Sequence, residues 1–309
     1  MDIIVYRELS SLARDLGVSG RTLYALSNHV VKHYRRVLLP KGSGEYRELH
    51  VPDDLLKMVQ KRIAERLLAM EPVSPYATAY RVGGSPMLNA KPHVGAPVLL
   101  KMDIRHFFDH VIYPVVKEKV FSAERYSEKN RVLLTLLCMY KDSLPQGAPT
   151  SPVISNIIMR DFDDRIGSYC RERGIRYTRY CDDLTFSGDF DPAPIKAFVR
   201  EELIKMGFYL NDKKTVVLRE GQKKTVTGIV VNERLNTSSA YRRSLRQDVR
   251  FCKKYGVADH LKHIGKVGVS EYSYLSQLLG RANYILQVDK DNAEVKGYKR
   301  WIIEQMTKH

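Results

Sequence analysis

The sequence predicts an α+β fold, in which a body of helices and short strands precedes a basic helical segment. Residues 175–180 and 184–188 alternate apolar and polar side chains around a Cys-Asp-Asp turn, which is typical of a β-hairpin. Apolar residues recur at helical spacing after the loop LPQGAPTSP, residues 144–152. From Tyr241 onward the pattern is helical. From Arg200 onward the chain carries 22 Lys and Arg against 12 Asp and Glu.

The N-terminal part is expected to be mainly helical. Residues 9–39 predict two short helices with Asp15 and Ser19 as caps. Within them, LARDLGVSGRTLYAL resembles a helix-turn-helix, although plain helical packing explains the pattern equally. The next elements expected are a turn at 41–44, a strand at 46–51, a helix at 52–70 and a loop at 83–97, which is rich in Gly and Pro.

The central part alternates strands with helices. Residues 98–108, VLLKMDIRHFF, predict an apolar strand that ends in Asp103 and two aromatics, and a leucine-rich helix is expected at 130–140. Ser151 is expected to cap the helix that follows the LPQGAPTSP loop, and Pro152 suits its first turn. Another helix is expected after the hairpin, and strands at 214–218 and 224–231 complete the body.

Charge and cysteine usage narrow the functional classes. The net charge of +16 and the pI near 9.6 favour a polyanionic partner, most commonly nucleic acid. The four cysteines form no CxxC pair, and the histidine spacings are weak, so neither a disulfide framework nor a zinc site is expected. We find no signal-peptide pattern and no apolar run long enough for a membrane span, which predicts a cytoplasmic protein without a membrane partner.

Three carboxylates indicate a metal site. Asp182 and Asp183 are adjacent at the tip of the predicted hairpin, where they would repel each other unless a cation neutralised them. A set of hard carboxylate oxygen ligands favours Mg²⁺ over zinc. Asp103, a charge at the end of an apolar strand, is the best candidate for the third ligand. Two ions held in this way can promote an in-line phosphoryl transfer. The alternative is an Asp-Asp turn and an unrelated strand-end Asp.

Three ordered motifs resemble those of reverse transcriptases. YCDD (residues 180–183) resembles the family's YxDD box, KMDIRHFF its first catalytic-aspartate motif, and LPQGAPTSP its nucleotide-pocket motif. Asp103 and Asp182 lie 79 positions apart, which fits the family. Two further segments resemble elements of bacterial retron reverse transcriptases: NAKPH, with Asn89, Ala90 and His93, and VTG, with Val226, Thr227 and Gly228. Cys181 departs from the alanine that is common there, and its thiol could make the site sensitive to oxidation.

The resemblance implies a right-hand polymerase fold and residue roles. Fingers with N-terminal helices would occupy residues 1–97, palm with part of the fingers 98–232, and a basic RNA-binding helical thumb 233–309. Asp103, Asp182 and Asp183 would be catalytic and bind two Mg²⁺ ions. Residues expected to bind the dNTP substrate are Arg47, Phe108, Gln146, Gly147 and Lys214. For three of these an alternative stays open: Arg47 as a surface residue, Phe108 as a core aromatic, and Lys213 in place of Lys214.

The C-terminal segment is expected to bind RNA. Arg242, Arg246, Arg250 and Lys254 lie four positions apart, so they share one helical face opposite an apolar seam. An ordinary solvated helix face is the alternative.

The resemblance also implies the biological setting. A retron-type RNA-directed DNA polymerase would copy part of a cognate structured noncoding RNA from an RNA 2′-hydroxyl primer. The branched RNA–DNA product (msDNA) would serve antiphage defence, with a separate effector protein and host RNase H as partners. Three alternatives remain: a reverse transcriptase of a mobile intron or diversity-generating element, an RNA-binding antitoxin scaffold, and a transcription factor built on the helix-turn-helix.

Overall fold

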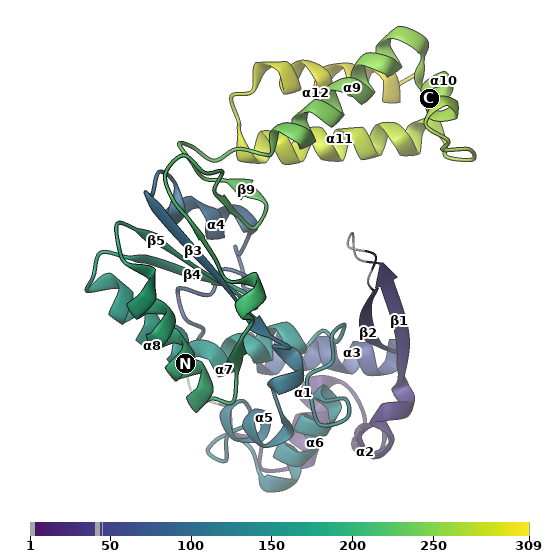
Figure 1. Ribbon diagram of the computed structural model, residues 1–309. Coiled ribbons are helices and arrows are strands. Elements are labelled where there is room, and N and C mark those ends of the chain that lie inside the picture. The colour runs from purple at the N-terminus through teal and green to yellow at the C-terminus, as the bar shows by residue number, and fades with distance from the viewer. Residues whose placement is uncertain (1–3, 41–43, 45, 309) are drawn as a thin grey trace. The chain divides into compact units, whose positions relative to one another are not determined.

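The computed structural model describes residues 4–40, 44 and 46–308, which form two compact units (Figure 1). Unit 1 contains the described residues up to Gly84 and Leu100–Val217. Unit 2 contains Ser85–Leu99 and the chain from Leu218 onward. The division into fingers, palm and thumb at residues 97 and 232 stays a prediction. No helix in the described ranges is long and apolar enough to cross a membrane.

The helices of unit 1 surround one hydrophobic core that runs from Tyr6 to Phe208. They are α1 (Leu9–Leu16), α2 (Gly20–Asn28), α3 (Asp54–Arg62), α5 (Tyr113–Lys119), α6 (Glu128–Cys138), α7 (Ser151–Arg171) and α8 (Pro192–Lys205). A π-helical turn, Ile63–Leu67, extends α3. The expected helices at 52–70 and 130–140 are therefore confirmed, with ends shifted by a few residues.

The N-terminal pair of helices is shorter than expected. The two expected helices form, but residues 34–40 are strand β1 (Tyr34–Pro40), so the helical prediction for the last part of 9–39 is wrong. β1 pairs antiparallel with β2 (Tyr46–Pro52), and this cross-strand pairing outweighs the local helical spacing. Ser19 caps α2, whereas Asp15 accepts a hydrogen bond from Tyr6 and caps no helix. The expected turn at 41–44 lies mostly outside the described residues.

The helix-turn-helix resemblance corresponds to a real pair of helices. Gly17, with φ of 63°, ends α1 in a left-handed conformation before α2 begins. Arg62 at the end of α3 donates to the carbonyls of Leu16 and Gly17, which fastens the turn to the rest of unit 1. Leu12 and Leu16 of α1 and Leu23 and Leu26 of α2 are buried in the core of unit 1. These contacts agree with a packing role for the pair.

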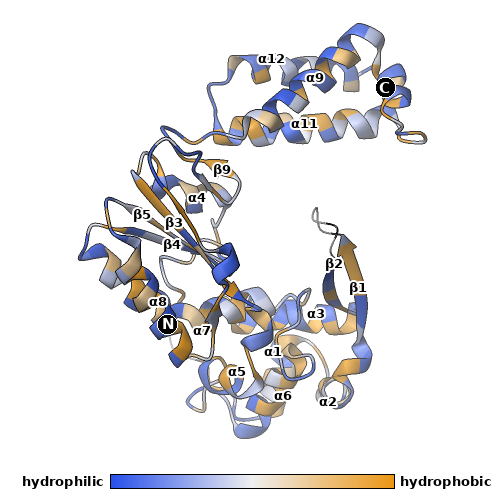
Figure 2. Ribbon diagram, in the orientation of Figure 1, coloured by the Kyte–Doolittle hydropathy of each residue, from blue (hydrophilic) through white to orange (hydrophobic). Residues whose placement is uncertain are grey.

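A five-stranded sheet positions the functional residues. Its strands are β3 (Val98–Arg105), β4 (Arg176–Tyr180), β5 (Asp183–Gly188), β6 (Tyr209–Leu210) and β7 (Val216–Leu218), in the order β4-β5-β3-β6 with β7 also paired to β3. β4 and β5 form the expected antiparallel hairpin. β3 is almost entirely buried, in keeping with its apolar sequence, which Figure 2 shows mostly in orange. α7 packs against β4 and α8 against β6.

Helix α7 begins where the LPQGAPTSP loop ends. Thr150 is its N-cap residue, and Ser151 is the first helical residue rather than the cap. The Ser151 hydroxyl instead donates to the Pro145 carbonyl, so it stabilises the loop itself. Pro152 lies in the first turn, as expected, where its missing N–H costs nothing. Ile154 and Phe162 are buried in the core of unit 1.

Unit 2 begins with a helix that the sequence did not predict. Residues 83–97 include α4 (Pro86–Ala90) and a 3₁₀ turn (Lys91–His93), so the loop expected there is wrong in part. Ser85 caps α4 and Pro86 opens it, which is a local signal strong enough to start a helix in a Gly- and Pro-rich segment. α4 packs on the short hairpin of β8 (Thr225–Val226) and β9 (Ile229–Val230).

The rest of unit 2 is helical, as the sequence predicts. Its helices are α9 (Ser239–Tyr255), α10 (Val257–His263), α11 (Glu271–Val288) and α12 (Ala293–Met306). They share a core in which Leu245, Leu278 and Ile302 are fully buried. Figure 2 shows α9 mostly in blue with short orange intervals, which is the pattern of an amphipathic helix.

Candidate active site

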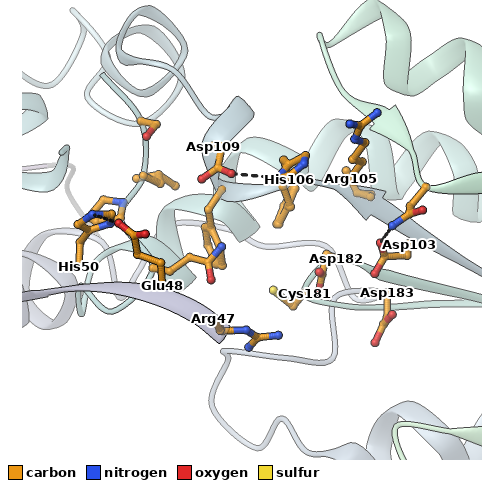
Figure 3. Close-up of a pocket in the computed structure, with 18 of the residues that line it drawn as sticks. Arg47, Glu48, His50, Asp103, Arg105, His106, Asp109, Cys181, Asp182 and Asp183 are labelled. Atoms are coloured by element: carbon orange, nitrogen blue, oxygen red, sulfur yellow. Dashed lines mark hydrogen bonds and ion pairs between the residues drawn. The ribbon is translucent and has the colours of Figure 1, made fainter. Parts of the chain in front are cut away.

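A cavity of about 900 Å³ in unit 1 collects most of the residues that the sequence singled out. Figure 3 shows Asp103, Asp182 and Asp183 at one end of it and Glu48 and His50 at the other. The expected site residues that line it are Arg47, Asp103, Phe108, Gln146, Asp182, Asp183 and Lys214. Residues separated by more than 160 positions therefore meet in one place.

Asp103 is held by two side chains that follow strand β6. It lies near the end of β3 and is only 6% exposed. Asn211 Nδ2 donates to Asp103 Oδ1 at 3.2 Å, and Lys214 Nζ lies 2.8 Å from Asp103 Oδ2. The backbone N–H of Asn211 also donates to the Asp103 carbonyl. Of the two lysines left open by the sequence, Lys214 lines the cavity with Asp103 and Lys213 does not.

Asp182 and Asp183 sit at the tip of the β4–β5 hairpin. Tyr180 pairs with Asp183, which leaves Cys181 and Asp182 as a two-residue turn. Cys181 has φ of 61°, a left-handed conformation that is unfavourable for a residue with a side chain. The Asp182 carbonyl accepts a hydrogen bond from the Ile104 N–H at 2.9 Å. This contact places the turn beside the strand end that carries Asp103.

Two of the three carboxylates have raised pKa values. Burial is the main cause that raises the pKa of Asp182, and the charge of Asp103 adds to it. Burial likewise raises the pKa of Asp183, and the charge of Asp182 adds to it. A divalent cation would relieve both effects, and an all-oxygen donor set suits a hard ion such as Mg²⁺. Within the described residues no three His, Cys, Asp or Glu side chains converge as a formed metal site, and Lys214 is the cation on Asp103.

Burial also decides the reactivity of Cys181. It raises the pKa of the thiol to about 12, with a further contribution from the charge of Asp182. The Tyr80 hydroxyl hydrogen-bonds to this thiol. Because the thiolate is the species that reacts with oxidants, the sensitivity to oxidation expected from the sequence is not supported by the structure.

The loop before α7 approaches strand β2 closely. The Gln146 carbonyl accepts a hydrogen bond from the His50 N–H at 2.8 Å. Gly147 has φ of 124°, and a Cβ atom there would lie 2.9 Å from the His50 carbonyl oxygen. A glycine suits this conformation and this contact, because a Cβ atom would be strained and would overlap the His50 carbonyl. Arg47 on the same strand turns its guanidinium toward the end of the cavity where the aspartates lie (Figure 3).

Phe108 follows β3 in a short 3₁₀ turn. Its ring lies 5.5 Å from that of Phe107, measured between centroids. Both residues line the cavity, but Phe107 is buried in the core of unit 1, whereas Phe108 is partly exposed. Phe108 is therefore the more accessible of the two rings to a ligand in the cavity.

These residues fit a family of known proteins. Residues 39–231 match the family model described as reverse transcriptase (RNA-dependent DNA polymerase). The chain is 36% identical over 266 residues to the retron Mx65 reverse transcriptase of Myxococcus xanthus, with 78% of this chain and 62% of that protein covered. It is 31% identical over 268 residues to the retron Ec86 reverse transcriptase of Escherichia coli, with 84% and 82% covered. The chain belongs to the retron reverse transcriptases.

Membership of this family brings with it the right-hand α+β polymerase fold. The chain spans less than two thirds of the length of the Myxococcus relative. Among solved structures, apo telomerase from Candida tropicalis aligns with a TM-score of 0.46 and 12% identity, over 94% of this chain and 63% of that one.

The two segments that resemble retron elements lie against each other in unit 2. Asn89 and His93 are fully buried in and after α4, and Val226 is buried in the β8–β9 hairpin. Thr227 Oγ1 donates to the Pro86 carbonyl at 3.0 Å. Ala90 and Val226 belong to the same small hydrophobic cluster. Gly228 has φ of 81°, which suits the tight β8–β9 turn. The NAKPH and VTG motifs are thus parts of one folded element.

The four cations of α9 fall into two pairs with different surroundings. Arg242 donates to the Asn236 side chain and the Thr237 carbonyl at the start of the helix. Arg246 forms a two-point ion pair with Glu294 of α12, with both nitrogen–oxygen distances at 2.7 Å. Arg250 and Lys254 line a cavity of about 490 Å³ together with Arg246, Lys253 and Tyr298. Among the described residues, Arg246 is the one of these four cations that has a carboxylate partner.

Several cavity residues were missed by the sequence reasoning. They include Glu48, His50, Arg105, His106, Asp109, Tyr140, Lys141 and Asn211. His50 stacks on Tyr140 with centroids 4.2 Å apart and lies 3.2 Å from Glu48, which joins β2 to the loop before α7. For Asn211 the available signal was its position three residues before Lys214. The other residues carry no spacing that separates them from surface polar residues.

Proposed function

We propose that this chain synthesises DNA on an RNA template by a two-metal nucleotidyl transfer. The observation that carries the proposal is the cavity in which Asp103, Asp182 and Asp183 meet the candidate nucleotide residues. The raised pKa values of Asp182 and Asp183 indicate a cluster that is short of positive charge. A site of this kind favours a bound divalent cation and a phosphate-bearing substrate.

The carboxylates and Lys214 would divide the chemistry between them. The reaction forms a bond from a primer hydroxyl oxygen to the α-phosphorus of a dNTP and releases pyrophosphate. Asp103, Asp182 and Asp183 would hold two Mg²⁺ ions, which when bound stabilise charge on the attacking and leaving oxygens. Lys214, whose Nζ lies 2.8 Å from Asp103 Oδ2, would give a proton to the leaving pyrophosphate.

The opposite wall of the cavity would bind and select the nucleotide. Arg47 presents a guanidinium, whose planar set of donors suits triphosphate oxygens. Gln146 and Gly147 let the loop backbone lie close to strand β2 and to the nucleotide. Phe108 would lie beneath the sugar, where its ring would collide with a 2′-hydroxyl and so favour dNTPs over rNTPs.

The retron setting extends the proposal to substrate and partners. The related proteins named above are retron reverse transcriptases, and this supports a structured noncoding RNA as template and an RNA 2′-hydroxyl as primer. The product would be a branched RNA–DNA hybrid, msDNA, that acts in antiphage defence with a separate effector protein. Host RNase H would remove template RNA. Arg250 and Lys254 are the cations of α9 best placed to bind RNA phosphates.

The test is to express the native operon and analyse the nucleic acid that purifies with the protein, with and without RNase. Wild-type protein should carry a short DNA joined to RNA. Asp182→Asn should carry none, yet should still bind the RNA. Asp161→Asn, which changes an exposed carboxylate on α7, is the matched control and should behave as wild type. A hybrid that persists in Asp182→Asn would refute the metal role. Activity only on a supplied template and primer would redirect the assignment to another reverse-transcriptase system.

A further inference from the structure

A fully buried ion pair lies directly behind the hairpin turn that carries Asp182. The side chains of Arg179 on β4 and Asp163 on α7 are both 0% exposed. Arg179 Nε and Nη2 reach the carboxylate at 2.8 and 2.6 Å, and the Tyr177 hydroxyl donates to Asp163 Oδ1 at 2.8 Å. Replacing such a pair by apolar side chains is often neutral or stabilising, so net stability alone is a weak reason for its presence.

The third nitrogen of the guanidinium points to the active site. Arg179 Nη1 donates to the Cys181 carbonyl at 3.1 Å. That carbonyl belongs to the peptide group joining Cys181 to Asp182, and Cys181 is the residue with φ of 61°. The next carbonyl, that of Asp182, accepts from the Ile104 N–H at 2.9 Å. The two peptide groups that flank the Asp182 Cα are therefore each fixed by one hydrogen bond, from opposite neighbours.

Arg179 is itself held firmly in place. Its N–H donates to the Tyr76 carbonyl at 2.8 Å, and its carbonyl accepts from the backbone N–H and the hydroxyl of Thr78. The Tyr76 ring in turn occupies the space beside Gly167, where a Cβ would lie 2.0 Å from the ring. Asp163 fixes the other end of the guanidinium. Because Arg179 is held so firmly, its hydrogen bond fixes the position of the Cys181 carbonyl in the turn.

We propose that Arg179, oriented by Asp163, is a positioning residue that sets the Cys181–Asp182 peptide and with it the metal affinity of the aspartate cluster. The inference rests on the proposed metal role of Asp182. Groups that orient metal ligands without touching the metal commonly contribute roughly 10- to 100-fold to metal affinity. Lysine cannot replace Arg179, because a single ammonium lacks the planar fork that reaches Asp163 and the Cys181 carbonyl together.

The decisive measurement is Mn²⁺ binding to the full chain, followed by electron paramagnetic resonance of the free ion, with thermal unfolding in metal-free buffer alongside. One variant combines Arg179→Met, Asp163→Leu and Tyr177→Phe, which replaces the pair and its hydroxyl partner by apolar groups. Arg179→Lys keeps the charge and is the second variant. Arg131→Met removes another buried arginine of unit 1, which contacts Phe121 and two glutamates rather than the turn, and is the control.

We expect both Arg179 variants to bind Mn²⁺ about ten-fold or more weakly than wild type, whatever their melting temperatures. Arg131→Met should lower the melting temperature and leave Mn²⁺ affinity unchanged. Unchanged Mn²⁺ affinity in either folded Arg179 variant, or an equal loss in Arg131→Met, would overturn the positioning role. Asp182→Asn separates this inference from the proposed function. If Asp182→Asn binds Mn²⁺ as tightly as wild type, the proposed metal site is wrong. If Asp182→Asn loses Mn²⁺ affinity but the Arg179 variants keep it, only the positioning role is wrong.

Discussion

Gly147→Ala tests how closely the nucleotide-pocket loop approaches strand β2. The new Cβ would lie 2.9 Å from the His50 carbonyl oxygen, which is backbone and cannot rotate away. The φ of 124° adds strain for any residue with a side chain. Strain of ~1–3 kcal/mol and overpacking of similar size together predict a loss of about 2–6 kcal/mol in the free energy of unfolding of unit 1. For a unit of this size, that lowers the melting temperature by roughly 4–24 °C.

The same change should weaken nucleotide binding more than it slows the chemical step. Moving the His50 carbonyl displaces the strand that carries Arg47 and disturbs the bond between the Gln146 carbonyl and the His50 N–H. The aspartates lie on β3 and in the β4–β5 hairpin and are not displaced directly. We therefore expect KM for dNTP to rise, with a smaller change in kcat, in a primer-extension assay at saturating template.

The matched control is Gly174→Ala, which also lies in unit 1. Gly174 has φ of 67°, but no atom lies within 4 Å of the position of its Cβ. It therefore isolates the conformational strain of a left-handed residue, ~1–2 kcal/mol, from the overlap with His50. A melting temperature for Gly147→Ala no lower than that of Gly174→Ala, with KM unchanged, would refute the close approach of loop and strand.

Four other predictions follow from the same cavity and from α9. Phe108→Val should admit rNTPs, and an unchanged ratio of dNTP to rNTP incorporation would remove Phe108 from the sugar pocket. RNA affinity should fall linearly with salt on a double-logarithmic plot, and Arg250→Gln or Lys254→Gln should each reduce the slope by about 1; a flat plot would contradict phosphate binding by α9. Cys181 should resist iodoacetamide at pH 8 in the folded protein, since burial raises the pKa of its thiol to about 12, and rapid alkylation would argue against that burial. Asp182→Asn should raise the melting temperature in metal-free buffer at neutral pH. The raised pKa of Asp182 means that its charged form opposes folding above that pKa and that protonation at lower pH relieves the cost; a lowered melting temperature would contradict this sign.

The parts of the fold that the sequence predicted correctly are those with local signals. Alternation identified the hairpin around the Cys-Asp-Asp turn, and helical spacing identified α7 and α9. The metal site stays a prediction, and choosing its three residues needed little long-range information. An aspartate that ends an apolar strand and two adjacent aspartates in a turn each call for a neutralising group, and the structure places all three in one cavity.

The parts that were missed depend on residues far away in the sequence. β1 has helical spacing, but pairing with β2 decides its conformation. The four cations of α9 look equivalent in the sequence, because the partner of Arg246, Glu294, lies 48 positions later on another helix. Asn211 and Arg179 look like ordinary polar residues until their partners, Asp103 and the Cys181 carbonyl, are placed beside them. Residue spacing in the sequence cannot predict such contacts, because they form only when separate helices and strands pack together.

The active site concentrates features that oppose folding, and its neighbours offset them by hydrogen bonding. Asp103 is a buried carboxylate, Cys181 is left-handed, and burial makes the charge of Asp182 unfavourable. The first two of these have dedicated partners: Asn211 and Lys214 for Asp103, and Arg179 for the Cys181 backbone. Among the described residues, neither Asp182 nor Asp183 has a cationic side chain within ion-pair distance. Because Asp103 is fully partnered and these two carboxylates are not, the cluster is suited to take its missing positive charge from a bound cation.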